Sequence, residues 1–223
     1  MVRWLRDASG RFPRRPHYEV AELESICADL FLELRQQRRQ PESYPITVDD
    51  LAVLVERHAA DLDLYAELAP DLDGVTDFTR GAKPRVRISA RLSSNARSHN
   101  RLRSTLAHEL AHVVLHNFIW WFDPGVAFDP QSLSPKCVLR IVSGDWMEWQ
   151  ANYCAGALLV PATAVPSLQN PVWERSATAR TLIRAVQTRF DVSAQLGTIR
   201  LRQLGHLTTR PRRIARAPIP KLW

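Results

Sequence analysis

Apolar residues recur every three or four positions over much of this chain, which is the period of a helix that buries one face. The segments with this pattern are residues 19–40, 48–60, 101–116, 146–160, 178–190 and 193–204. Thr47, with Asp50 three residues later, is typical of a helix N-cap, and Ser193 suits the same position before the last segment. The pattern therefore predicts a largely helical protein.

Between these helices the apolar period changes, which predicts a few short strands. The strand candidates are residues 63–68, 75–79 and 85–90, and the last of them alternates polar and apolar side chains as a half-exposed strand does. We predict that they form a small antiparallel sheet before residue 101. Residues 1–18 carry Pro13 and Pro16 and no apolar period, so they are expected to be irregular.

The helix predicted over residues 101–116 contains the pattern His-Glu-x-x-His. His108 and His112 lie on one face of that helix, about 5–6 Å apart at Cβ. Two imidazoles at this spacing can share a tetrahedral Zn²⁺ ion. Glu109 is placed to take a proton from a water molecule on that ion. No Pro or Gly interrupts the apolar stripe around the pattern, so a zinc-binding helix is favoured over a chance match.

A catalytic zinc ion usually has three protein ligands, so a third is expected elsewhere. His116 lies on the same face, but three ligands from His108 to His116 span about 12 Å of helix axis, too far for one ion. We interpret His116 as structural or as a partner of a ligand. Glu148, on the helix over residues 146–160, is the better candidate, although spacing alone leaves it equally well a surface residue. Asn152, one turn later, is placed to hydrogen-bond a ligand imidazole.

The two helices together resemble those of the ImmA/IrrE family of metallo-endopeptidases. Residues 105–116, TLAHELAHVVLH, are similar to the family's TLAHELGHLLLH zinc helix, and residues 148–161, EWQANYCAGALLVP, to its E-x-x-A-N-x-F-A-x-x-L-L-M-P helix. The likeness covers about residues 45–162 and includes GVTDF at residues 74–78, where the family has GV-x-x-F. The departures are Ala111 for a frequent glycine, Cys154 for a frequent Phe, and Gln150 for a second acid.

This resemblance implies an α+β fold with a zincin-like minimal metalloprotease core. In such a core a small antiparallel sheet packs on the HExxH helix and on a second, ligand-bearing helix, here with helical additions at both ends. The expected organisation is a basic segment with an N-terminal helix (1–45), the metallopeptidase domain (46–165), a helix-turn-helix-like region (166–209) and a basic tail (210–223).

The resemblance also implies that His108, His112 and Glu148 bind Zn²⁺ and that Glu109 is the general base of peptide-bond hydrolysis. The sequence does not rank the candidates for a donor to the oxyanion, which are Tyr153, His116 and His206. The implied substrate is a helix-turn-helix transcriptional repressor, cut in the control of a mobile element or a stress response. The alternative from another class is a non-catalytic regulator that binds DNA or protein on a zincin scaffold.

The chain has a net charge of +7, much of it at its two ends. Such clusters either contact nucleic acid or an acidic partner, or remain solvated, and the helix pair within residues 178–207 either packs on the catalytic domain or contacts DNA or a partner. Residues 117–145, rich in aromatic residues and proline, either complete the core or cover the site. The clustered cations are Arg3, Arg6, Arg11, Arg14, Arg15, Arg210, Arg212, Arg213, Arg216 and Lys221.

Composition indicates a cytoplasmic protein. Cys27, Cys137 and Cys154 are widely spaced and odd in number, which argues against a disulfide framework. No apolar run approaches the roughly 18 residues that cross a membrane. The basic N-terminal segment lacks the apolar stretch of a secretory signal.

Overall fold

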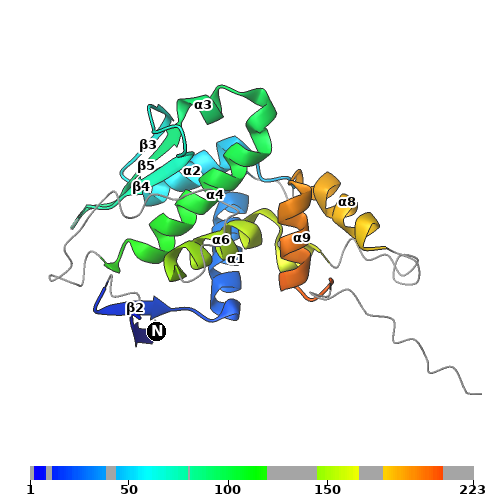
Figure 1. Cartoon of the computed structure of the whole chain (residues 1–223), viewed down its shortest axis with the longest axis horizontal. Helices are drawn as coiled ribbons and strands as arrows, with labels where there is room; N and C mark the ends of the chain where they lie inside the picture. The colour runs from blue at the N-terminus through cyan, green and yellow to red at the C-terminus, as the bar shows by residue number, and fades with distance from the viewer. Residues whose placement is uncertain are drawn as a thin grey trace, which may run out of the picture.

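Helix α4 (His99–His116), which carries the His-Glu-x-x-His pattern, lies between a small sheet and a second helix, α6 (Trp146–Leu159) (Figure 1). The computed structural model describes residues 3–8, 12–38, 44–79, 81–119, 145–165 and 178–207. The other helices are α1 (Val20–Arg38), α2 (Val48–His58), α3 (Ala90–Ser93), α8 (Ala179–Phe190) and α9 (Ala194–Gln203), with short 3-10 turns at Ala96–Ser98 and Ala162–Ala164. The α+β class is therefore as predicted.

The sheet beside α4 is mixed, so the prediction of a purely antiparallel sheet was wrong. Its strands are β3 (Asp61–Ala66), β4 (Gly74–Asp77) and β5 (Arg85–Ser89), in the order β3-β5-β4. β4 and β5 pair antiparallel, whereas β3 and β5 pair parallel, because β4 lies between them in the sequence and runs opposite to both. β5 takes the central place because its Val86 and Ile88 are both fully buried.

The N-terminal segment is also more regular than predicted. β1 (Arg3–Arg6) and β2 (Arg14–His17) form an antiparallel hairpin, although their sequences show no apolar alternation. Single apolar contacts replace that alternation, since the buried Phe12 meets the ring of Trp146 edge-on at a centroid distance of 6.0 Å. Trp4 of β1 also packs edge-on against Phe118, so contacts with distant residues, and not an apolar alternation of its own, position the hairpin.

Almost every residue from Leu102 to His116 is buried, because α4 is covered by α6 on one side and by α2 and β4 on the other. Both helices carry small buried residues, Ala107 and Ala111 on α4 and Ala151 and Ala155 on α6, which suits a close approach of the two helices. This contact brings the two predicted ligand-bearing segments together.

Two helix starts follow the predicted caps. Thr47 and Asp50 form a reciprocal capping box at α2, and the Ser193 hydroxyl accepts the Leu196 N–H at α9. At α6 the cap is Asp145, whose carboxylate accepts the N–H groups of Met147 and Glu148. The cap of α6 therefore fixes the turn that carries Glu148.

The helix pair α8–α9 packs on the rest of the described structure through two buried arginines. Arg103 of α4 donates to the carbonyls of Phe190 and Asp191 at the end of α8, and Arg200 of α9 donates to the Val160 carbonyl at 2.9 Å. The thiols of Cys27 and Cys154 are free and buried, and Cys137 lies outside the described residues. Among the described helices, none has the length and apolar character needed to cross a membrane.

Candidate metal centre

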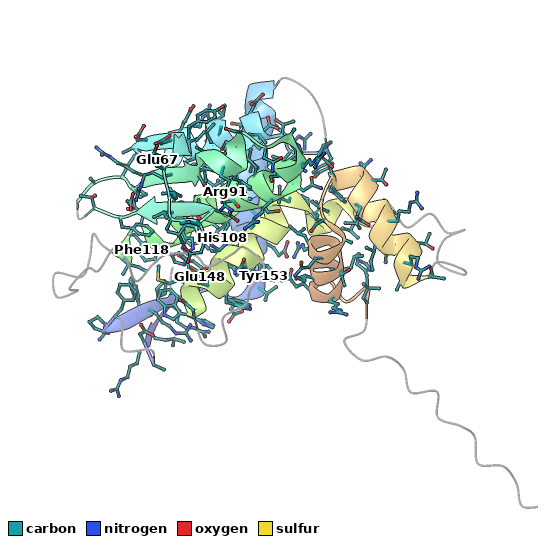
Figure 2. All side chains as sticks on the ribbon, turned by 45° about the horizontal axis from the view of Figure 1, so that its top comes forward. Glu67, Arg91, His108, Phe118, Glu148 and Tyr153 are labelled. Carbon is teal, nitrogen blue, oxygen red and sulfur yellow. The ribbon has the colours of Figure 1, made fainter. Side chains whose placement is uncertain are left out.

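Three potential metal donors converge at the contact of α4 with α6. The Nε2 atoms of His108 and His112 lie 3.0 Å apart, and the Glu148 carboxylate lies 3.3 Å from the first and 3.2 Å from the second. Figure 2 shows His108 on α4 and Glu148 on α6 side by side. All the donor atoms lie within 4.8 Å of one another, so this group can hold a metal ion.

Burial and neighbouring charges act in opposite directions on the pKa values of this group. His108 and His112 are almost completely buried, and the side chain of Glu148 is 14% exposed. Burial by itself raises the pKa of Glu148, but His112 and His108 outweigh it and hold that pKa well below its usual range. Burial likewise lowers the pKa of His112, yet the charge of Glu148 leaves it raised. The carboxylate is therefore ionised and available as a ligand.

Glu109 points to strand β4 and is held there. Its Oε2 accepts a hydrogen bond of 2.7 Å from the Thr76 hydroxyl, while its buried Oε1 has no partner among the described residues. A Cβ atom added at Gly74 would lie 2.8 Å from Oε1 of Glu109 and 2.7 Å from Cγ2 of Thr105. Burial raises the pKa of Glu109, against the opposing charges of His108 and His112.

His116 lies outside the donor group and contacts one member of it. Its Nδ1 is 3.0 Å from Nδ1 of His112, and its Nε2 is 3.0 Å from Oε1 of Gln150. The Gln150 amide in turn donates to the Pro16 carbonyl at 3.3 Å. His116 is fully buried, and this burial together with the charge of His112 moves its pKa well below the usual value.

Asn152 and Tyr153, two other predicted site residues, make no hydrogen bond to the donor group within the described part of the chain. Neither amide atom of Asn152 has a partner among those residues, and the same holds for the buried Nδ1 of His108. The Tyr153 hydroxyl donates to Glu24 at 2.5 Å and accepts from Arg200 at 3.3 Å. Burial and the bond to Glu24 raise the pKa of Tyr153 to about 12. Tyr153 is therefore engaged between helices, not at the donor group.

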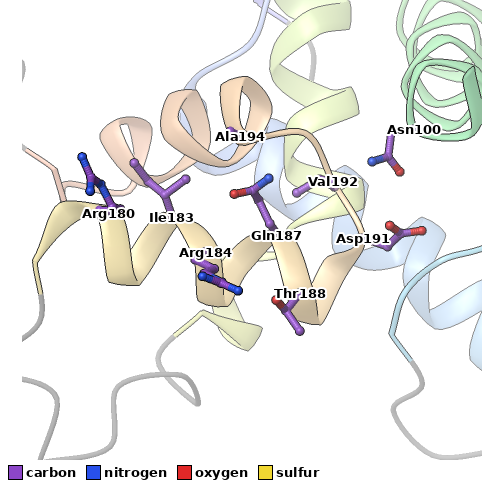
Figure 3. Close-up of a pocket in the computed structure, with 9 residues that line it drawn as sticks. All are labelled: Asn100, Arg180, Ile183, Arg184, Gln187, Thr188, Asp191, Val192 and Ala194. Atoms are coloured by element: carbon purple, nitrogen blue, oxygen red, sulfur yellow. The ribbon is translucent and has the colours of Figure 1, made fainter. Parts of the chain in front are cut away.

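The remaining predictions concern regions away from these donors. His206 follows the end of α9, where its N–H donates to the Leu201 carbonyl at 2.9 Å. Of the aromatic segment 117–145, residues 120–144 lie outside the described part, so its role stays a prediction. A hollow along α8, lined among others by Gln187, Asp191 and Asn100, contains none of the metal donors (Figure 3).

Sequence reasoning missed the residues that hold Glu109 and His116 in place. Gly74 and Thr76 lie two positions apart on one face of β4, and GVTDF had been noted only as part of the resemblance. Gln150 had been noted only as a departure from the family pattern. A scan of family models found none that matches the chain, and a search of curated proteins found no match either. The functional assignment accordingly rests on the residues of the site.

Proposed function

We propose that this protein is a zinc-dependent endopeptidase of the kind found in the ImmA/IrrE family. In this proposal His108, His112 and Glu148 hold the zinc ion and Glu109 is the general base. The observation that carries the proposal is the convergence of two imidazole nitrogens and a carboxylate on one point, with a second buried carboxylate on the same helix turn.

The donor atoms suit zinc in both spacing and chemistry. Four ligands at about 2.0–2.1 Å in a tetrahedron place neighbouring ligand atoms about 3.3–3.4 Å apart. The separations in this group are 3.0, 3.2 and 3.3 Å. Two imidazoles favour zinc or a similar transition metal over Mg²⁺ and Ca²⁺, which take oxygen ligands. Three protein ligands also leave a fourth position for water, as a catalytic zinc requires.

Bound zinc would lower the pKa of its water and polarise the scissile carbonyl. The protein's own part is proton transfer. Glu109 is buried with its pKa raised, so it is suited to take a proton from the attacking water and to deliver it to the leaving amine. Thr76 occupies Oε2 of this carboxylate, which leaves Oε1 for the proton.

The proposed substrate is a helix-turn-helix transcriptional repressor in the cytoplasm. Support for it comes from the resemblance over about residues 45–162, which covers the zinc helix, the Glu148 helix and the GVTDF strand. The resemblance suggests a regulatory cut at one site and not general protein digestion.

The test combines zinc content with cleavage. The full chain is co-expressed with the repressor encoded nearest to it, and each variant is also purified for metal analysis. Glu109→Gln should keep its zinc and lose about 10²–10⁴-fold in cleavage rate, because only proton transfer is removed. His112→Ala and Glu148→Ala should lose zinc.

Two results would contradict the proposal in different ways. A Glu148→Ala protein that holds zinc as firmly as the wild type removes Glu148 from the ligand set. Firm zinc binding by the wild type with no cleavage product under any inducing condition favours the non-catalytic regulator instead.

A further inference from the structure

We propose that His116 and Gln150 form a directional hydrogen-bond chain from the metal ligand His112 to the N-terminal hairpin, so that metal binding and hairpin docking stabilise each other. The inference rests on the ligand set of the proposed function and not on peptide hydrolysis. Its basis is a series of three buried contacts. They run from His112 to His116 at 3.0 Å, from His116 to Gln150 at 3.0 Å, and from Gln150 to Pro16 at 3.3 Å.

The direction of the chain follows from the chemistry of a ligand imidazole. Nε2 of His112 faces His108 and Glu148, so in the metal-bound protein its lone pair is on the ion and its proton is on Nδ1. That Nδ1–H donates to Nδ1 of His116, and the proton of the neutral His116 is consequently on Nε2, which donates to Oε1 of Gln150. The amide NH₂ of Gln150 is then the group that faces the Pro16 carbonyl.

The reverse direction is incompatible with the last contact. If the proton of His112 moved to Nε2, Nδ1 of His112 would accept from His116, and Nε2 of His116 would become an acceptor. Gln150 would then have to turn its NH₂ toward His116 and its oxygen toward Pro16. A proline carbonyl accepts hydrogen bonds and cannot donate one, so two oxygens would face each other. The Pro16 contact therefore favours the tautomer of His112 that leaves Nε2 free for a metal.

The residues around this hydrogen-bond series exclude solvent from it and connect it to the hairpin. His116 is 0% exposed and Gln150 2% exposed, and the Trp146 ring packs edge-on against His116 at a centroid distance of 5.6 Å. On the hairpin side, Phe12 meets the same Trp146 ring at 6.0 Å. Buried hydrogen bonds in such surroundings are costly to leave unmade, so a change at either end affects the other. Linkage then requires the coupling to be reciprocal.

The test measures the zinc affinity of the full chain by chelator competition. Two variants interrupt the hydrogen-bond series, and a control variant leaves it intact. Gln150→Leu and His116→Phe remove the polar groups but keep side-chain volume, and each should weaken zinc binding about 10–100-fold. The matched control is Tyr18→Phe, which removes a different bond between the N-terminal region and α4, the 3.3 Å contact of the Tyr18 hydroxyl with the Leu115 carbonyl. Its zinc affinity should equal that of the wild type.

Two further measurements complete the test, and their wild-type results do not depend on any variant folding. Zinc should slow amide exchange in residues 3–17, and this effect should be absent in Gln150→Leu. Imidazole ¹⁵N shifts of the zinc-loaded protein should show the proton of His112 on Nδ1 and that of His116 on Nε2.

A His116 protonated on Nδ1 overturns the proposal, and so does a Gln150→Leu protein with unchanged zinc affinity. A loss in Tyr18→Phe as large as in Gln150→Leu also overturns it, because general loosening of the N-terminal region would then be the cause. A wild type that binds no zinc overturns the ligand set itself. A protein that binds zinc and never cleaves overturns only the proposed hydrolysis.

Discussion

The carboxylate of Glu109 is seated by two positions of β4 that share one face of the strand. Thr76 holds one oxygen with a hydrogen bond, and Gly74 provides the space that the other oxygen fills. A buried carboxylate with a single donor is sensitive to the loss of that donor. We therefore expect both β4 positions to act on the proposed general base without contacting the metal.

Replacement of Thr76 tests this placement. Thr76→Val keeps the shape and removes the donor, so we expect a loss of about 5–150-fold in cleavage rate, since about 1–3 kcal/mol of buried hydrogen bonding is withdrawn from Glu109. Thr76→Ser keeps the hydroxyl and should restore most of the rate. The measurements are kcat, KM and zinc content. A lower affinity for zinc in Thr76→Val, in place of a lower kcat, would contradict a role confined to Glu109.

A methyl group at Gly74 should be poorly tolerated. The new Cβ would lie 2.7 Å from Thr105 and 2.8 Å from Glu109, and both residues are buried on α4. We expect Gly74→Ala to lower the free energy of unfolding by about 1–3 kcal/mol through overpacking. The matched control is Gly156→Ala, whose Cβ meets nothing nearer than 3.8 Å and which should gain up to about 1 kcal/mol of helix propensity. Urea unfolding of both variants measures the contrast, and equal effects would contradict it.

At the level of elements, helices α1, α6 and α9 are joined by one buried polar network. Arg200 of α9 is fully buried and contacts both carboxylate oxygens of Glu24 on α1, each at 2.7 Å. The Tyr153 hydroxyl of α6 completes the network. A two-point contact of this kind is directional as well as strong, so it fixes how α9 lies on α1 and α6.

The stabilising effect of this network should depend on pH. Burial opposes ionisation of Glu24, but hydrogen bonds from Arg200 and Tyr153 outweigh it and lower its pKa. A lowered pKa contributes stability above the ordinary pKa, near 4.5, and that stability is lost as the pH falls through the lowered value. Glu24→Gln should therefore cost about 1.5–3 kcal/mol at pH 7, because Arg200 keeps a buried charge without its partner.

A charge-removing substitution at the surface of α1 separates the effect of the buried network from the effect of lost charge. Asp29→Asn removes the same charge from an exposed position of α1 and should leave the free energy of unfolding nearly unchanged. Urea unfolding from pH 7 down to pH 3 should show the gap between wild type and Glu24→Gln closing in acid. A gap that keeps its pH 7 size down to pH 3 would exclude ionisation of Glu24 as its cause.

The elements also show which parts of the fold a sequence predicts. Helices with a clear apolar period, such as α1, α2 and α9, were predicted with nearly the observed bounds. The parallel pairing of β3 with β5 was missed because it depends on the strand order β3-β5-β4, which differs from the order in the sequence and follows from burial in three dimensions. The β1–β2 hairpin was missed because its contacts are with residues about a hundred positions or more later in the sequence, Phe118 and Trp146.

The same limit applies to the candidate site. The spacing within α4 was sufficient to select His108, Glu109 and His112, because helix geometry alone relates them. Tyr153 illustrates the opposite case. It follows Glu148 by five residues, which is about 140° around the helix, so the two side chains face different neighbours. Only the packing of α1 and α9 on α6 shows that Tyr153 belongs to the Glu24–Arg200 network.

Across the whole molecule, α4 is the element on which the other parts depend. It contacts the sheet through Glu109, α6 through the proposed metal ligands, and the end of α8 through Arg103. It reaches the hairpin indirectly, through His116 and then Gln150. A metal ion at His108, His112 and Glu148 would therefore join two central helices. Its removal should lower the free energy of unfolding of the whole protein, and not only disturb the site.

Zinc removal tests this prediction through thermal stability, without any measurement of cleavage. A ligand present at 1,000 times its Kd adds about 4 kcal/mol to the free energy of unfolding. For a chain of this size that corresponds to about 8–16 °C in Tm. We expect chelation to lower the Tm of the wild type by an amount in this range, and zinc but not Mg²⁺ to restore it, because the donor set suits zinc. Glu109→Gln should show the full shift, since its ligands are intact, whereas His112→Ala should show none. Complete loss of zinc by metal analysis with an unchanged Tm would mean that the α4–α6 contact is formed without help from the ion.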